Sequence, residues 1–250
     1  MRFVSYAVAL LAGAASVLGF SPFGWFPVLL AALAVLIQLW LRTNRSAFLI
    51  GWCFGLGMFA SGVSWIYVSL HRFGAMPAPL AALATLGFCA FLALFPAFAG
   101  WTQAKLRAPL AIPALWVLFE WLRGWILTGF PWLSVGYAAI DSPLAGFAPL
   151  GGVTLVSLAT VISAGLLWLV AVGQARWLAA AGFAAIGLAG SGLRGVEWTE
   201  PAARPVSASL LQGNVPQSVK FDPARYERIL ETYARLADGS ADVVIVAPED

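Results

Sequence analysis

A glutamate that follows an apolar strand is the best-placed candidate for catalysis in this sequence. Glu249 stands in the motif APED, directly after the β-branched run at residues 243–246. The active sites of α/β folds collect in the loops at the carboxyl ends of strands, and a carboxylate there can serve as a general base. The alternative is an ordinary loop acid that caps the next helix.

Two opposite charges lie inside an otherwise apolar segment. Glu120 and Arg123 are three residues apart, so in a helix they share one face. Charged side chains within a membrane are costly, and they usually face a bundle interior or a polar cavity, often as a pair. We expect a structural ion pair that fixes helix packing. The alternative is contact with a lipid headgroup or a substrate.

The histidine and the two cysteines lack partners in the sequence. His71 has no second metal ligand nearby, and Cys53 and Cys89 lie in apolar stretches without metal-ligand spacing. We interpret His71 as part of an interfacial loop and the cysteines as packing residues. The sequence therefore predicts no metal site and no cofactor.

A long aromatic segment, FPWLSVGYAAIDSPLAGFAPLGG at residues 130–152, connects two apolar stretches. Aromatic rings with a polar edge prefer the membrane–water interface, so a simple aromatic belt explains this composition. The alternative is a platform on the outer face beneath a soluble domain. In that case Trp132 and Tyr137 are candidate substrate-binding residues.

The composition is that of a membrane protein. Of the 250 residues, 61% are hydrophobic and 10% are charged, against about 45–50% and about 25% in soluble domains; the mean hydropathy is +0.88. The basic residues are scattered singly at the ends of apolar segments, which excludes a nucleic-acid-binding surface. Most charges follow residue 192, so the first part is predicted to lie in lipid and the last in water.

Seven stretches are long and apolar enough to span a bilayer, which takes about 20 residues. We predict a multi-pass α-helical membrane bundle with spans at Val4–Phe20, Trp25–Leu41, Ala47–Leu70, Leu80–Gly100, Leu110–Leu127, Val153–Val172 and Trp177–Gly192. Closely spaced glycines in the third stretch, at 51, 55 and 57, favour close packing of helix backbones. A cleaved signal peptide is the alternative for the first stretch.

The charges of the short loops predict the orientation. With a cytoplasmic N-terminus, the outer loops hold a single basic residue, Arg72, and the inner loops hold six: Arg2, Arg42, Arg45, Lys105, Arg107 and Arg176. Cytoplasmic loops carry an excess of Lys and Arg. The N-terminus is therefore predicted to be cytoplasmic, and the odd number of spans puts everything after Gly192 on the outer face.

The residues after Arg204 have the pattern of a soluble α/β domain. A short strand at Val206–Leu211, a helix with an apolar stripe from Asp222 onward and an apolar strand at Asp242–Ala247 form a strand–helix–strand unit. We expect the stripe to be buried. Because a unit this small rarely stands alone, we predict that a larger domain outside the membrane is cut short here.

Several motifs follow the order seen in a known family. They are SPFGWFP, GWCFGLGMFASGVSWIYVSLHRFG, LALFPAF, LFEWLRGWILTGFPWLSVGYAAIDSPLAGFAPLGG, EWTEP and LLQGNVPQSVKFDP. From about Ser21 to Glu249 the chain resembles apolipoprotein N-acyltransferase, an enzyme of lipoprotein maturation in the bacterial inner (cytoplasmic) membrane.

The resemblance implies a helical bundle at residues 1–195, followed at residues 205–250 by the incomplete start of a periplasmic nitrilase-like domain, an α-β-β-α sandwich. It implies transfer of a fatty acyl chain from a phospholipid, through a cysteine thioester, to the α-amine of the diacylglyceryl-cysteine of an apolipoprotein. The implied partners are that phospholipid donor, the apolipoprotein acceptor and membrane lipid, with no nucleic acid. Glu249 in APED matches the catalytic glutamate of the family.

The sequence departs from the family pattern at two positions and in its length. Ala247 and Phe221 stand where the family has tryptophan, and the retained ring makes Phe221 a candidate substrate-binding residue. The Lys and nucleophilic Cys of the family match nothing in this chain, so the 250 residues alone are expected to be inactive. The alternatives to an acyltransferase are a non-catalytic membrane fragment and a transporter-like membrane subunit.

Overall fold

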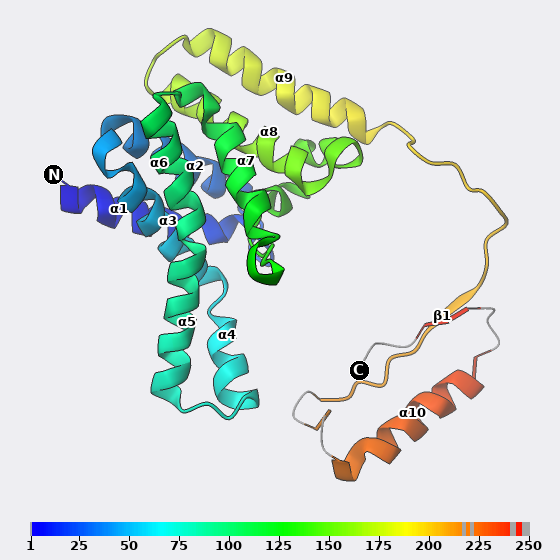
Figure 1. Ribbon diagram of the computed structural model, residues 1–250. Helices are drawn as coiled ribbons and strands as arrows, with labels where there is room; N and C mark the ends of the chain where they lie inside the picture. Colours follow the sequence, from blue (N-terminus) through cyan, green and yellow to red (C-terminus); the bar gives the residue numbers. More distant parts are fainter. Residues whose placement is uncertain (1, 217–218, 221–222, 241–243, 247–250) are drawn as a thin grey trace. The chain divides into compact units, whose positions relative to one another are not determined.

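The computed structural model describes residues 2–216, 219–220, 223–240 and 244–246. The chain divides into two compact units, Met1–Val196 and Glu197–Asp250. Figure 1 labels the helices and strands of each unit, and each is described by itself.

The first unit is built from α-helices joined by short turns. The helices are α1 (Arg2–Ser16), α2 (Phe26–Arg42), α3 (Ala47–Gly62), α4 (Trp65–Val68), α5 (Ala78–Leu92), α6 (Leu94–Leu106), α7 (Ile112–Arg123), α8 (Ala148–Ala171) and α9 (Arg176–Arg194). The short 3₁₀ turns are η1 (Val17–Gly19), η2 (Asn44–Ser46), η4 (Pro109–Ala111), η5 (Ile126–Thr128), η6 (Val135–Ala139) and η7 (Pro143–Phe147), and η3 (Ser69–Phe73) is a single π-helical turn. Helices α2, α7 and α8 carry a proline in the first turn, where the missing N–H has no intrahelical partner to lose.

Helix α3 lies at the centre of this unit. It packs against α1, α2, α5 and α6, and α9 packs on α8 (Figure 1). The side chains of Leu33, Trp40 and Phe54 are fully buried in the main hydrophobic core. The indole Nε1 of Trp40 donates a hydrogen bond to the carbonyl oxygen of Ala47 at 3.0 Å. This bond ties the end of α2 to the start of α3.

Glycines bring α3 close to its neighbours on two sides. A Cβ atom on Gly51 would lie 2.8 Å from the Cα of Ala97 in α6. A Cβ atom on Gly57 would clash with the carbonyl group of Leu10 in α1. Only glycine permits such contact between helix backbones, so the close packing predicted for the third stretch is confirmed.

Three helical stretches of the described residues are long and apolar enough to cross a membrane: Ala78–Leu106, Pro143–Ala171 and Arg176–Arg194. A fourth results if α2 and α3, which are bent by 113°, form one broken span. Helix α1 belongs to a shorter apolar helix, Phe3–Gly19. The chain is thus mostly helical with three to four candidate spans. The count of seven stays a prediction.

Two of the predicted stretches are interrupted. The third, Ala47–Leu70, contains α3, the short α4 and part of η3, and in the fifth, Leu110–Leu127, helix α7 ends at Arg123. Apolar residues continue through both breaks. Hydropathy indicates that a segment prefers lipid, but it does not indicate where a helix within that segment ends. Helix α8 also has a kink at Gly151 and Gly152. Gly152 has a φ of +60°, which glycine adopts without steric cost.

The second unit contains β1 (Ala208–Leu210), η8 (Pro223–Arg225), α10 (Tyr226–Asp238) and β2 (Val244–Val246). The strands pair in parallel, with Ala208 opposite Val244, so the predicted strand–helix–strand order is present in the described residues. The burial expected for the stripe of α10 is wrong for this unit. Tyr226 is 56% exposed and Leu230 is 45% exposed, whereas Ile229 and Tyr233 are partly buried and the ring of Tyr233 lies close to Gly213.

Candidate functional site

Glu120 joins three separate parts of the first unit. Its Oε2 accepts hydrogen bonds from the backbone N–H of Val135 at 2.9 Å and from the indole Nε1 of Trp116 at 3.4 Å. Its Oε1 accepts one from the hydroxyl of Ser157, whose oxygen in turn accepts from the N–H of Gly136 at 2.9 Å. One carboxylate therefore connects α7, the turn η6 and α8.

Arg123 lies on the same helix and is only 3% exposed. Its Nη1 donates to the carbonyl oxygen of Phe130 and to that of Trp132, the latter at 2.6 Å. Its Nη2 donates to the hydroxyl of Ser134 at 3.3 Å, and its guanidinium lies 5.2 Å from the ring centre of Phe59 in α3. A buried guanidinium needs acceptors for its N–H groups, and the loop at residues 130–134 supplies them.

The two charges fix the loop rather than each other. Among the described residues, the hydrogen bonds of Glu120 and Arg123 go to the loop, to Ser157 of α8 and to Trp116 of α7 itself, and none joins the two side chains. The expected packing role is therefore carried by two separate anchors and not by a direct ion pair. Because protein donors occupy both carboxylate oxygens, this network is suited to positioning the aromatic loop and not to abstracting a proton.

The loop held by Arg123 carries a cluster of aromatic rings. Trp132 stacks on Phe130 with 5.1 Å between ring centres and lies 6.0 Å from Trp65 of α4. Phe130 meets Phe88 of α5 edge to face at 5.0 Å. Trp132 is nevertheless 51% exposed, so about half of this residue is open to a ligand.

Tyr137, the other aromatic candidate, lies in η6 and is 53% exposed. Within the described part of the chain, the ring contacts of Trp132 are with Phe130 and Trp65, and Tyr137 takes no part in them. The structure thus places both candidates on the segment anchored by Glu120 and Arg123 without joining their rings.

An apolar hollow of about 330 Å³ lies between α2, η7, α8 and α9. Phe26, Pro143, Leu167 and Phe183 are among the residues that line it. Concave apolar sites of this size take apolar ligands. The hollow therefore has the lining and the volume for part of an acyl chain.

Two predicted site residues, Glu249 and Phe221, lie outside the described residues. Of the remaining candidates, His71 has its Nδ1 2.9 Å from the carbonyl oxygen of Met76, and its ring stacks on Tyr67 at 5.5 Å. Cys89 is buried in α5 and carries a free thiol. In the part of the chain that the structure describes, no three His, Cys, Asp or Glu residues come together as a metal site.

Two serines of the network were missed by the sequence reasoning. Ser134 bonds to Arg123 and Ser157 bonds to Glu120. Both are buried. Each is one hydroxyl in a long apolar or aromatic stretch, and residue type alone does not separate a serine that bonds a charge from one that bonds its own helix. What distinguishes these two serines is a buried charge beside each hydroxyl, and the serine and the charge meet only in the folded chain.

The helical unit is similar in sequence to a known family. Residues 12–166 match the model of the apolipoprotein N-acyltransferase N-terminal domain. The matched range contains Glu120, Arg123, Ser134 and Ser157, so the whole anchoring network lies within it.

Curated relatives match along nearly the whole chain. The apolipoprotein N-acyltransferase of Nitrosomonas europaea is 48% identical over an alignment of 249 positions, which covers 95% of this chain and 50% of that protein. Those of Chromobacterium violaceum and Ralstonia nicotianae are 43% and 41% identical, over 95% and 100% of this chain and 48% and 50% of those proteins. The chain therefore spans about half the length of the curated relatives it matches.

Proposed function

Because the chain belongs to the apolipoprotein N-acyltransferase family, we propose that the full-length protein transfers a fatty acyl chain from a phospholipid to an apolipoprotein. The acceptor is the α-amine of the diacylglyceryl-cysteine at the N-terminus of the lipoprotein. The observation that carries this proposal is the 48% identity to a named N-acyltransferase over 95% of the chain.

The proposed reaction proceeds through a thioester on a cysteine of the full-length protein. Glu249 is the proposed general base: it accepts the thiol proton before the thiolate attacks the acyl ester of the phospholipid and gives it to the departing lysophospholipid oxygen. Later it accepts the proton of the amine that attacks the thioester and returns it to the departing cysteine sulfur. A covalent intermediate divides one difficult acyl transfer into two easier steps. The support for Glu249 is its place in APED, shortly after the end of β2 at Val246.

The proposed domain division follows from the same family. Residues 1–195 form a bundle of about seven spans in the bacterial inner membrane, and residues 205–250 begin a periplasmic nitrilase-like catalytic domain. Both substrates are confined to the bilayer, so the reaction must take place close to its surface. The half-exposed rings of Trp132 and Tyr137 support a role in holding lipid there, with Phe221 as a third candidate from the sequence.

Reporter fusions test the proposed topology. Alkaline phosphatase, which is active only in the periplasm, is expected to be inactive when fused after Gly173 and active when fused after Arg204. The reason is the excess of basic residues in the loops assigned to the cytoplasm. A cytoplasmic reporter at the same two positions serves as the control and should give the opposite pattern. Periplasmic activity after Gly173 would contradict the proposed orientation.

Complementation tests the proposed activity. In a strain depleted of its own N-acyltransferase, the full-length protein is expected to restore growth and to yield N-acylated lipopeptides by mass spectrometry. An empty vector and an unrelated membrane protein of similar size are the controls. If growth returns while the α-amine of the lipoproteins stays free, the protein acts in another way, as a transporter-like subunit would.

A further inference from the structure

A hollow of about 650 Å³ lies at one end of the first unit, away from the aromatic loop along helix α7. It is formed by the end of α2, the turn η2, helix α6 and the turn that follows α6. Arg45, Lys105 and Arg107 are among the described residues that line it, and none of the lining residues is acidic. Three positive charges around one concave surface attract anions.

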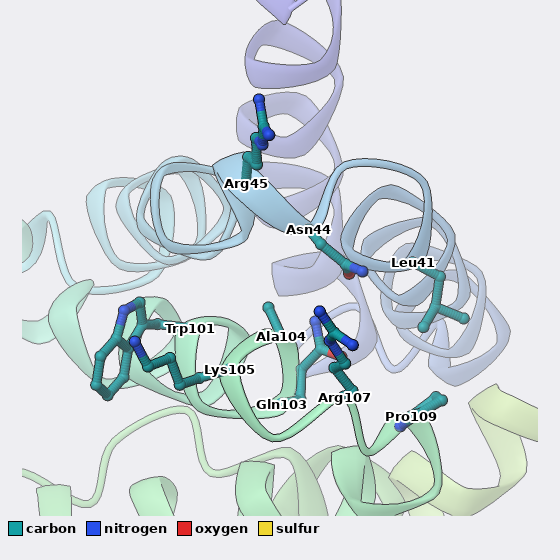
Figure 2. Close-up of a pocket in the computed structure, with 9 residues that line it drawn as sticks. All are labelled: Leu41, Asn44, Arg45, Trp101, Gln103, Ala104, Lys105, Arg107 and Pro109. Carbon is teal, nitrogen blue, oxygen red and sulfur yellow. The ribbon is translucent and has the colours of Figure 1, made fainter.

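A buried amide without a partner faces this hollow. Gln103 is 2% exposed. Among the buried side-chain nitrogen and oxygen atoms of the described residues, its Nε2 is the one that lacks a hydrogen-bond partner. Figure 2 shows Gln103 projecting from α6 in the direction of Asn44 and Arg107, which line the same hollow. An unpaired buried donor costs free energy that an apolar side chain would avoid, so Gln103 marks a position for an acceptor.

The three cations contribute in different ways. Figure 2 shows the guanidinium of Arg107 reaching into the middle of the hollow, towards Gln103 and Asn44, whereas Arg45 extends away from the other lining residues. Lys105 lies along α6 on the side of Trp101. The planar fork of a guanidinium matches the oxygens of a phosphate group. Arg107 is therefore the ligand-facing charge, and the other two strengthen the field at the rim.

An apolar groove of about 250 Å³ adjoins the basic hollow. Leu41 and Pro109 line both of them. The groove continues between α2, α7 and α8, where Ile162 and Leu166 form part of its wall. Trp101, at the edge of the hollow, is 49% exposed, as suits a ring at the membrane–water interface. A basic hollow beside an apolar groove matches the two parts of a phospholipid, its phosphate group and its acyl chain.

We propose that this end of the bundle binds an anionic phospholipid. Arg107 and Asn44 hold its phosphate group, the amide of Gln103 in the wall of the hollow turns towards it as a further donor, and one acyl chain lies in the groove beside Ile162 and Leu166. The loop charges assign this end to the cytoplasmic side, where the leaflet is rich in anionic lipid. The site is thus separate from the acyl donor proposed at the periplasmic surface and does not depend on acyl transfer. Its lipid ties the α2–α3 turn to the α6–α7 turn.

Native mass spectrometry of the full-length, delipidated protein tests the proposal. The protein is titrated with phosphatidylglycerol, with phosphatidylcholine and diacylglycerol of the same chains, and with inorganic phosphate. Phosphatidylglycerol bound at the proposed periplasmic site is common to the wild type and the variants, so the difference between them reports the hollow alone. We expect Arg107→Asn to lose one bound phosphatidylglycerol, with an affinity lower by about tenfold to a hundredfold, because a hydrogen bond to a charged group is removed.

The variants are chosen to preserve the fold. Arg107 has a left-handed backbone, with φ at +52°, and asparagine tolerates this conformation better than most residues. Arg176→Asn is the matched control, because Arg176 belongs to the same predicted cytoplasmic side but does not line the hollow. Gln103→Leu removes the unpaired donor. We expect it to raise the melting temperature without lipid and to reduce the rise that phosphatidylglycerol produces.

Three other results would each contradict a defined part of the proposal. If inorganic phosphate binds as tightly and displaces the lipid, the hollow is a site for a free anion. If diacylglycerol or phosphatidylcholine binds as tightly as phosphatidylglycerol, the basic residues select no headgroup. If Arg107→Asn and Arg176→Asn lose the same amount of lipid, or if Gln103→Leu keeps the full thermal shift, the hollow does not bind the phosphate.

Discussion

Full-length protein with the substitution Glu249→Gln is expected to transfer acyl chains about 10² to 10⁴ times more slowly, the usual contribution of a positioned general base. Glutamine keeps the size of the side chain and its hydrogen-bonding reach but cannot take up the thiol proton. Apolipoprotein with a free α-amine should therefore accumulate at normal enzyme levels. The acyl-enzyme trapped from labelled phospholipid should form slowly, because deprotonation of the thiol precedes attack.

The neighbouring acid supplies a matched control for this prediction. Asp250→Asn removes the same charge one residue further along and is expected to leave the rate of thioester formation unchanged. If Glu249→Gln forms the acyl-enzyme at the wild-type rate, Glu249 is an ordinary loop acid and another residue is the base. The assignment of the chain to its family would not be affected by that result.

Arg123→Met is expected to destabilise the membrane bundle by about 3–5 kcal/mol, because it removes three hydrogen bonds of a buried charged group, and each such bond typically contributes about 1.5–3 kcal/mol without strict additivity. Methionine fills a similar volume but donates no hydrogen bond. The carbonyl groups of Phe130 and Trp132 lose their donor, and Glu120 keeps a charge with no positive neighbour on its helix. A lower melting temperature and a several-fold lower level in membranes are the expected measurements.

Two further variants make this second prediction specific. Arg72→Met removes the same charge from an exposed position in η3 and is expected to have little effect on the melting temperature. Combining Arg123→Met with Glu120→Gln should destabilise the protein by less than the sum of the single changes, because both residues hold the same loop. Strict additivity would show that the two anchors act independently.

The apolar stretches predicted several helices well and their interruptions poorly. Helices α8 and α9 fall on the sixth and seventh predicted stretches, because continuous apolar sequence of that length has one stable arrangement in lipid. The break after Gly62 and the end of α7 at Arg123 were not predicted. At both places the chain contacts residues outside the helix that ends there: Phe130 donates its backbone N–H to the carbonyl oxygen of Arg123, and Leu133 lies beside Gly62. Gly62, for example, lies against the side chain of Leu133, which closes space that a longer side chain would need.

The sequence predicted the two charged residues of the candidate site but not the groups to which they bond. The spacing of Glu120 and Arg123 placed them on one helix face, which is a local property of the sequence. Their bonds to Val135, Ser157 and the loop carbonyls depend on how residues 130–135 fold back against α7. Gln103 illustrates the same limit at the other end of α7, because its burial results from α6 packing beside the α2–α3 turn.

The close contact between α1 and α3 also determines what can lie against one face of α1 in the bilayer. Helix α1 presents Gly13, where a Cβ atom would clash with the carbonyl group of Phe54 in α3. That small-residue face offers lipid tails little side-chain surface to contact. The backbone of α3 therefore fits this face of α1 more closely than lipid does, while α2 packs on another part of the same helix.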